Sequence, residues 1–232
     1  MTETTPDIAV IFGATGGIGA ALTRRITASG HYGSVLELGR TTKPGFDLTD
    51  EASIAAALSA VAEKGSIRLA LDATGYLHDS RSGPEKSLRD IDPEAMARSF
   101  ALNAIGPALL FKHLVPLLPR QGRTVLATLS ARVGSISDNR MGGWYAYRAS
   151  KAALNQITRS AAIEIARKRP EAICVALHPG TVDTGLSRPF ARDGLEVQSP
   201  DDAAERLMAV IDGLTPADTG GFFDHKGLPV PW

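Results

Sequence analysis

Short apolar segments alternate with longer amphipathic segments along most of this chain. A segment such as 8–12, which reads Ile-Ala-Val-Ile-Phe, is rich in β-branched residues and has no polar position. That pattern is typical of a strand buried on both faces of a sheet. By this criterion the predicted strands are residues 8–12, 34–39, 67–72, 123–129, 172–177 and 220–223.

Helices are predicted between these strands, where apolar residues recur every three or four positions, the spacing of one buried helix face. Gly30 closes the first helix, and Asp92 with Pro93 opens the third as an N-cap followed by a first-position proline. The predicted helices are residues 20–29, 50–63, 92–114, 144–168 and 199–211. This alternation predicts an α/β fold: a single domain, residues 1–232, with one Rossmann-type, doubly wound parallel sheet and helices on both faces.

A proline interrupts the third predicted helix. Pro107 has no N–H, so it cannot bond to the carbonyl four residues back, which belongs to Asn103. We expect a kink here and a freed buried carbonyl, a natural place for an ordered water. The alternative is a structural kink beside an asparagine that only serves the core.

Composition excludes several classes of partner. Lys+Arg and Asp+Glu both number 25, so the formal net charge is zero and nothing indicates nucleic acid or an anionic membrane. We expect no secretory signal and no apolar stretch of transmembrane length. Cys174 is the only cysteine and lies in a predicted strand, which excludes an intrachain disulfide and a thiolate metal cluster. These features predict a cytoplasmic protein.

A glycine-rich turn follows the first predicted strand directly and leads into the first helix. Strand, turn and helix in this order are the context of a dinucleotide site, because small residues let the backbone approach a diphosphate at the helix N-terminus. The glycines at 13, 17 and 19 are spaced GxxxGxG, and the standard fingerprint is GxGxxG; the alternative is an ordinary tight turn. The predicted cofactor-binding residues of this turn are Gly13, Thr15, Gly16, Gly17, Ile18 and Gly19.

Candidate ligand-binding residues follow the ends of five predicted strands. They are Gly13, Arg40, Ala73, Ser130 and Pro179. In a doubly wound sheet the ligand crevice lies beyond the carboxyl ends of the strands, so we expect these residues to share one site. The residue after the second strand faces the adenosine ribose, and an arginine there can bind a 2′-phosphate. We therefore predict NADP(H) as the cofactor in preference to NAD(H); the alternative is a solvated arginine at a strand end.

Tyr147 and Lys151 lie four residues apart in a predicted helix, so they share one face. A free tyrosine has a pKa of about 10, and a nearby ammonium lowers it. This spacing predicts a phenol that exchanges a proton with a substrate oxygen. The alternative is a packed ring beside a solvated charge.

Taken together, these motifs resemble the short-chain dehydrogenase/reductase family over nearly the whole chain. The matching motifs are residues 13–19, Asp47-Leu48, Asn103-Ala-Ile-Gly106, Ser130, Tyr147-x-x-x-Lys151 and Pro179-Gly180. The stretch 130–151 is similar to a narrower branch, which contains the C-factor-like signalling proteins and the sniffer-type carbonyl reductases.

The resemblance implies a role for each catalytic residue. Tyr147 would protonate a carbonyl oxygen as hydride arrives, and Lys151 would lower the pKa of that tyrosine and hold the nicotinamide ribose. Ser130 would bind the carbonyl, and Asn103 would hold a water that relays protons to Lys151. The further cofactor contacts that it implies are Asp47, Leu48, Ala73, Thr74, Gly75, Pro179, Gly180, Thr181, Val182 and Thr184.

The chain departs from the family pattern in three places. Phe12 replaces a threonine that braces the glycine turn, and the segment 72–75 reads Asp-Ala-Thr-Gly in place of Asn-Asn-Ala-Gly, which we expect to loosen the central strand. Ser130 lies 17 residues before Tyr147, so the loop 131–143 is expected to bulge over the substrate site. Ser135 is nearer in sequence, but we favour Ser130 because it ends a strand and rigid elements position groups well.

These observations predict an oxidoreductase that transfers hydride between NADP(H) and a small carbonyl or alcohol compound. The apolar residues Met141, Trp144, Leu186, Phe190 and Leu195 in the two loops near the site favour a mostly apolar substrate. The alternative is a nucleotide-binding signalling protein of the C-factor type with little turnover; an epimerase or dehydratase fits so short a chain less well. The resemblance also implies a homodimer or homotetramer.

Overall fold

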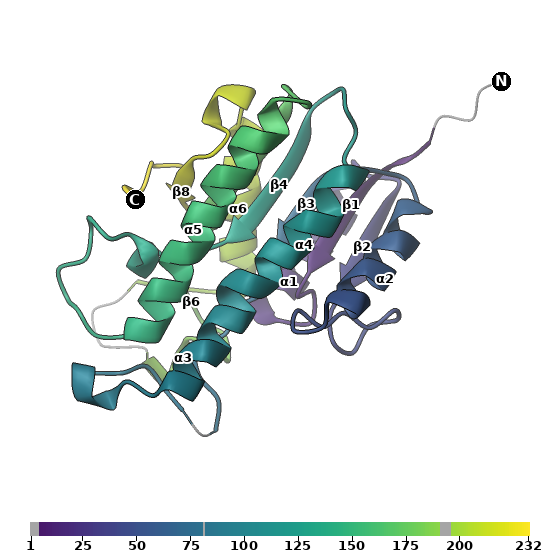
Figure 1. Cartoon of the computed structure of the whole chain (residues 1–232). Coiled ribbons are helices and arrows are strands. Elements are labelled where there is room, and N and C mark those ends of the chain that lie inside the picture. Colours follow the sequence, from purple (N-terminus) through teal and green to yellow (C-terminus); the bar gives the residue numbers. More distant parts are fainter. Residues whose placement is uncertain (1–4, 81, 191–195) are drawn as a thin grey trace.

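The fold was determined as a computed structural model, which describes residues 5–80, 82–190 and 196–232. Its centre is a six-stranded sheet in the order β2-β1-β3-β4-β5-β8, in which every strand pair is parallel (Figure 1). The strands are β1 (Asp7–Phe12), β2 (Ser34–Leu38), β3 (Ser66–Asp72), β4 (Thr124–Leu129), β5 (Ala172–His178) and β8 (Phe222–Asp224). Because the order reverses direction at β1 and β3, the sheet is doubly wound, as predicted.

In the described part of the chain, six α-helices cover the two faces of this sheet. They are α1 (Gly17–Ser29), α2 (Glu51–Ala62), α3 (Pro93–Phe100), α4 (Gly106–Leu114), α5 (Tyr145–Ala166) and α6 (Pro200–Gly213). Successive β1 residues alternate between the faces: Val10 packs in the cluster that α2, α4 and α5 cover, whereas Ile11 packs under α1 and α6. Figure 1 shows α4 and α5 lying side by side in front of the sheet, with α1 and α6 behind it.

The helix predicted over residues 92–114 is divided by a π-helical turn at Ala101–Ile105. Gly106 donates its N–H to the carbonyl of Ala101, five residues back. Pro107 follows immediately and offers no N–H, so the regular ladder cannot continue through it. The irregularity expected at this proline therefore exists as a π-turn, a feature common at functional sites.

The helical run Pro93–Leu117 contains an 18-residue window with a mean hydropathy of 1.4, so by length and composition it is apolar enough to cross a membrane. No such stretch was expected from the sequence, and that expectation is wrong. In this fold the apolar side of the run is occupied, since Leu110 and Leu114 are fully buried in the core beside the sheet. The core helix of an α/β protein meets the same criterion.

Several short elements were not expected from the sequence. β6 (Thr181–Val182) and β7 (Val197–Gln198) form a two-stranded parallel sheet within stretches assigned to loops. Two-residue strands carry no hydrophobic period, so no pattern could indicate them. The short 3-10 turns are Leu88–Asp90, Val115–Leu117, Arg132–Gly134, Arg188–Phe190 and Pro216–Asp218.

Asp72 links two central strands of the sheet, whereas its segment was expected to loosen the strand. The residue lies at the end of β3 opposite Thr128 of β4. Thr128 donates its hydroxyl proton to one carboxylate oxygen at 2.9 Å, and the main-chain N–H of Thr74 donates to the other at 3.0 Å. The hydroxyl of Thr74 also donates to Asp72. The carboxylate therefore ties β3 to β4 at their carboxyl ends.

Candidate active site

The glycine turn after β1 is pressed against the segment that follows β3. Gly13 has a left-handed φ of 77° and donates its N–H to the carbonyl of Leu38 at 2.7 Å. A Cβ at this position would lie 3.0 Å from the backbone of Ala73 and Thr74. These contacts hold the turn without the threonine hydroxyl that Phe12 replaces; Phe12 instead packs its ring in the core.

The N-terminus of α1 is open to an anion. Within α1, all of which the structure describes, Gly16 is an N-cap without a side-chain hydrogen bond and the first turn holds no acidic residue. Thr15, Gly16 and Gly17 are exposed. A Cβ on Gly19 would lie 2.2 Å from the carbonyl oxygen of Gly13, so the turn needs glycine to close. Free N–H groups at the positive end of a helix fit a diphosphate.

The segment after β5 lies beside this turn. A Cβ on Gly17 would meet the methyl group of Thr184 at 2.7 Å. Pro179 and Gly180 follow β5, and Gln198 of β7 donates its side-chain amide to the carbonyl of Pro179. The structure thus brings Thr184 of the predicted segment 179–184 to the glycine turn.

Arg40 and Asp47 lie past the end of β2, on the adenosine side of the predicted site. The Arg40 side chain is exposed. Hydrogen bonds from Thr49 hold the pKa of Asp47 below its ordinary value, and attraction to Arg40 acts in the same direction. Leu48 is buried against Gly106, where a Cβ would lie 2.8 Å from the Leu48 side chain. Arg40 is therefore an exposed cation at this corner of the fold.

Tyr147 and Lys151 lie in the first two turns of α5 and are both buried, with 9% and 2% of their surface exposed. Lys151 donates from Nζ to the main-chain carbonyl of Leu129 at 2.8 Å. Burial lowers the pKa of Lys151 to about 8, and the nearby carboxylate of Asp72 opposes that shift.

Burial also raises the pKa of Tyr147 above its ordinary value. From the sequence, Lys151 was expected to lower this pKa. The structure differs because the phenol is desolvated and the ammonium is bonded to Leu129. The phenol is therefore protonated at neutral pH.

Asn103 stands in the π-turn and connects two parts of the site. Its Oδ1 accepts the main-chain N–H of Tyr76 at 2.8 Å, and its Nδ2 donates to the carbonyl of Tyr76 and to Ser150 Oγ. Ser150 in turn donates to the carbonyl of Tyr147 at 2.9 Å. A Cβ on Gly75 would lie 3.8 Å from Lys151 Nζ and 3.9 Å from Asn103 Oδ1, so these two groups lie near one another. The water that Asn103 is expected to hold stays a prediction.

The hydroxyl groups of the two candidate serines form hydrogen bonds with groups other than Tyr147. Ser130 donates its hydroxyl proton to Oδ1 of Asn155 at 2.6 Å, and both side chains are buried. Ser135 Oγ accepts the main-chain N–H of Asp138 at 3.2 Å. Among the residues that the structure describes, no hydrogen bond joins either serine hydroxyl to Tyr147. Ser130, which follows β4, is thus hydrogen-bonded to Asn155 of α5, one helical turn beyond Lys151.

Asn155 was missed from the sequence. It lies four residues after Lys151 and eight after Tyr147, so the three side chains occupy one face of α5. Its Nδ2 is buried without a hydrogen-bond partner in the described part of the chain. The spacing of four and eight residues was a usable signal, because a polar residue on a buried helix face needs a reason to be there.

Glu85 was also missed, in a segment assigned to a surface loop. Its side chain is buried, and its carboxylate accepts the N–H of Ala146 at 3.2 Å. Its main-chain carbonyl accepts the N–H of Trp144, which precedes α5 with a left-handed φ of 54°. A negative charge at the start of a helix is stabilising. Glu85 therefore caps the helix that carries Tyr147, and no local sequence pattern could reveal this long-range contact.

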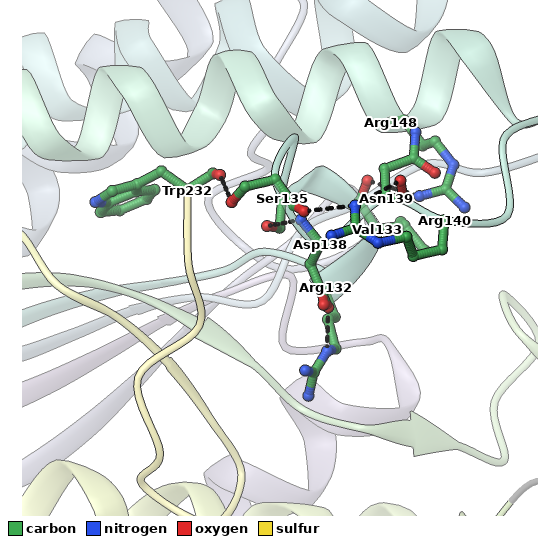
Figure 2. Close-up of polar contacts among 9 residues, drawn as sticks. Arg132, Val133, Ser135, Asp138, Asn139, Arg140, Arg148 and Trp232 are labelled. Carbon is green, nitrogen blue, oxygen red and sulfur yellow. Dashed lines mark hydrogen bonds and ion pairs between the residues drawn. The ribbon is translucent and has the colours of Figure 1, made fainter.

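The loop 131–143 is anchored to α5 and to the C-terminal residues, as Figure 2 shows. The contacts are Arg132 Nε to Asp138 Oδ2 (2.6 Å), Ser137 N to Trp232 O (3.0 Å) and Arg148 Nη1 to Val133 O (3.2 Å). A Cβ on Gly134 would lie 2.9 Å from the backbone of Lys151, so the loop packs tightly on α5. Met141 is 79% exposed.

Aromatic side chains form one wall beside Tyr147. The ring of Trp144 lies edge-on to Tyr147 with centroids 6.1 Å apart, and to Phe190 at 5.4 Å. His78 meets the other edge of Phe190 at 5.2 Å. Two of the expected apolar pocket residues are thus brought to the tyrosine, whereas Leu195 lies outside the described residues. This wall favours an apolar molecule near the phenol.

The fold and the arrangement of side chains define a Rossmann-type α/β protein. The family described as enoyl-(acyl carrier protein) reductase matches residues 34–210. The C-signal of Myxococcus xanthus is 41% identical over 152 residues, which cover 65% of this chain and 87% of that relative. The chain therefore belongs to the short-chain dehydrogenase/reductase family of oxidoreductases, as its motifs suggested.

Solved structures have the same fold. The NADPH-bound carbonyl reductase from chicken fatty liver has a TM-score of 0.83 at 24% identity, covering 99% of this chain and 100% of its own. The carbonyl reductase Sniffer of D. melanogaster has a TM-score of 0.82 at 20% identity, with the same coverage. At these identities the likeness concerns the fold.

A pH-dependent loss of stability is expected from His178, which ends β5. Burial lowers its pKa to about 4; His225 and Arg132 add to the shift, and Asp224 opposes it. Between pH 6.5 and 4 the unfolded chain binds a proton that the folded chain does not, so stability falls as pH falls through this window. The loss should reach about 3 kcal/mol.

Urea unfolding at pH 4, 5, 6 and 7 measures this effect. His178→Asn should remove the corresponding part of the pH slope, whereas His31→Asn, at an exposed position, should leave it unchanged. Equal slopes for wild type and His178→Asn would contradict the assignment.

Proposed function

We propose that this protein is an NADP(H)-dependent oxidoreductase that transfers a hydride between the nicotinamide and a small carbonyl or alcohol substrate. The observation that carries the proposal is the buried pair Tyr147 and Lys151 on one face of α5. The pair lies at the carboxyl edge of the sheet, where the glycine turn leaves α1 uncapped. NADPH bound to the chicken carbonyl reductase of the same fold supports this reading.

The residues present fit a dinucleotide. The glycine turn and the N-terminus of α1 would hold its diphosphate, Arg40 its adenosine side, and Lys151 the ribose next to the nicotinamide. When bound, the nicotinamide supplies or accepts the hydride. The chain's own part is to orient the substrate and to handle the proton.

Tyr147 suits the proton-donating role. Because burial raises its pKa, the phenol carries its proton at neutral pH and can give it to a carbonyl oxygen as that oxygen becomes negative. The rings of Trp144 and Phe190 exclude water beside it. Desolvation strengthens the electrostatic interactions within such a site. We therefore place carbonyl reduction as the favoured direction.

A signalling protein that keeps the fold is the second candidate, since the C-signal is 41% identical over the matched residues. The two functions differ in turnover. Purified protein with NADPH and a panel of aldehydes, ketones and quinones should consume NADPH, which is followed by its absorbance. No consumption with any substrate, together with measurable NADPH binding, would favour the signalling function.

We also propose a cytoplasmic location and a homodimeric or homotetrameric assembly. The single cysteine, Cys174, is free and fully buried, which suits a reducing compartment. The assembly follows from the family resemblance and is measured by light scattering on the purified protein.

Replacement of the phenol hydroxyl tests the proton donor. Tyr147→Phe keeps the ring and its packing, so cofactor binding and the melting temperature should stay near wild type while kcat falls by at least about a hundredfold. Trp144→Phe is the matched control, because it alters the same aromatic wall and keeps the hydroxyl. Turnover of Tyr147→Phe near the wild-type value would remove Tyr147 from the mechanism.

The role of Ser130 is tested against that of Ser135. We expect Ser130→Ala to lose more kcat/KM than Ser135→Ala, by about tenfold, since Ser130 sits at the end of β4 and is held by Asn155. Melting curves of both variants separate loss of activity from loss of folding. A larger loss in Ser135→Ala would assign the substrate contact to the loop serine.

Arg40 is expected to select NADPH over NADH. A charge-assisted bond to the 2′-phosphate is worth about 1.5–3 kcal/mol, and the exposure of Arg40 places the preference at the lower end, about tenfold in kcat/KM. Arg40→Ala should remove most of this preference, and Lys43→Ala, which alters a neighbouring cation, should remove less. Equal use of NADH and NADPH by the wild type would rule out the role.

A further inference from the structure

A buried carboxylate lies next to Lys151 without an ion pair to it. Asp72 is 1% exposed, and its two oxygens accept hydrogen bonds from Thr74 and Thr128. Bonds of this kind stabilise a carboxylate in its charged form. The fold thus holds an acidic group in the core in a fixed orientation.

The backbone places this group near the ammonium. Lys151 Nζ bonds to the carbonyl of Leu129, the residue that follows the Asp72 partner Thr128. The same Nζ lies 3.8 Å from the Cβ position of Gly75, three residues after Asp72. The Lys151 ammonium therefore lies at the carboxyl ends of β3 and β4, the same place at which Asp72 bonds to Thr128.

Asp72 is the negatively charged group that acts on the Lys151 ammonium. Burial raises the pKa of Asp72 and lowers that of Lys151 to about 8, and each charge opposes the shift of the other. The other titratable residues on the surrounding elements are Tyr147, one turn before Lys151 on α5, Tyr76, which bonds to Asn103, and His178, which ends the strand beside β4. In the described ranges 5–80, 82–190 and 196–232, no other carboxylate acts on the pKa of Lys151.

The nearest arginines are engaged elsewhere. Arg132, on the 3-10 turn that packs against α5, pairs with Asp138. Arg98 on α3 pairs with Asp79, and Arg148 on α5 bonds to main-chain carbonyls. The charge next to Lys151 therefore comes from Asp72.

We propose that Asp72 is a positioning residue that acts through Lys151: its buried carboxylate keeps the ammonium protonated at neutral pH. The role of that ammonium in turnover rests on the proposed function. The electrostatic effect of Asp72 on the pKa of Lys151 does not depend on that function. An attraction between two opposite charges in the protein interior shifts a pKa by roughly one to two units. The lysine would otherwise lose its proton near neutral pH, as buried lysines do.

A direct titration of Lys151 tests the pairing in the cofactor-free protein. Lysine labelled with ¹³C at Cε is followed by NMR from pH 5 to 11, and Lys151→Arg identifies the signal. The wild-type midpoint should lie near 8, and Asp72→Asn should lower it by about one to two units. Asp201→Asn, which removes an exposed carboxylate on α6, should leave it unchanged. An unchanged midpoint in Asp72→Asn overturns the proposal.

Asparagine has the shape of aspartate and can still accept from Thr128, so the variant should fold. Its melting curve checks this, and Asp72→Ser provides a second neutral side chain if Asp72→Asn does not fold. The same fall in midpoint is expected for both.

The pH profile of kcat/KM provides the second readout. At pH 7.5 Asp72→Asn should lose about three- to twenty-fold and recover relative to wild type at lower pH, because a shifted lysine regains its proton there. A uniform loss at every pH would mean a structural role only and overturn the proposal. If no substrate is turned over, the proposed function fails while the NMR titration still decides the pairing.

Discussion

The docking of α5 on the end of β4 is the contact on which the rest of the site depends. Lys151 bonds to the carbonyl of Leu129, and the next strand residue, Ser130, bonds to Asn155 one turn further along the helix. Both bonds are buried, so water does not compete for them. The two bonds fix the position of α5 along the direction of β4, and they thereby fix the distance of Tyr147 from the edge of the sheet. Because Gly134 has no side chain, the loop after β4 can pack directly against Lys151 of α5.

The same contact determines the electrostatics of the site. Burial opposes charge on Lys151 and Asp72 and keeps Tyr147 neutral. One positive and one negative group share a dry region, and the phenol beside them holds its proton. Chemistry that moves a proton onto an oxygen as negative charge develops there requires such an arrangement. The spacing of Tyr147 and Lys151 correctly placed both residues on one helix, but the direction of the tyrosine pKa depends on burial, which spacing does not reveal.

Local and periodic features were predictable from the sequence, and long-range contacts were not. The six strands of the main sheet and the glycine turn were predicted from short apolar segments and the glycines and prolines that bound them. The observed strand ends lie within a few residues of the predicted ones. Glu85, Asn155 and Asp72 gain their roles from partners 25 to 61 residues away. No window of sequence contains such pairs. Asp72 was misjudged for this reason, since the residue that completes its contact lies on another strand.

Fold and sequence likeness leave open a protein that binds a nucleotide without turning over a substrate, but the burial of charge argues against it. A buried lysine lowers the stability of the fold unless its interactions offset the hydration that it loses. In a helix with only a structural role, apolar side chains at such positions often give the more stable protein. In this chain Lys151 is almost fully buried, bonded to one carbonyl and provided with a carboxylate nearby. A protein that used only the glycine turn and Arg40 to bind its ligand would have no physical need for this arrangement. The proposed proton transfer supplies such a need, because it uses a charged lysine beside a desolvated tyrosine.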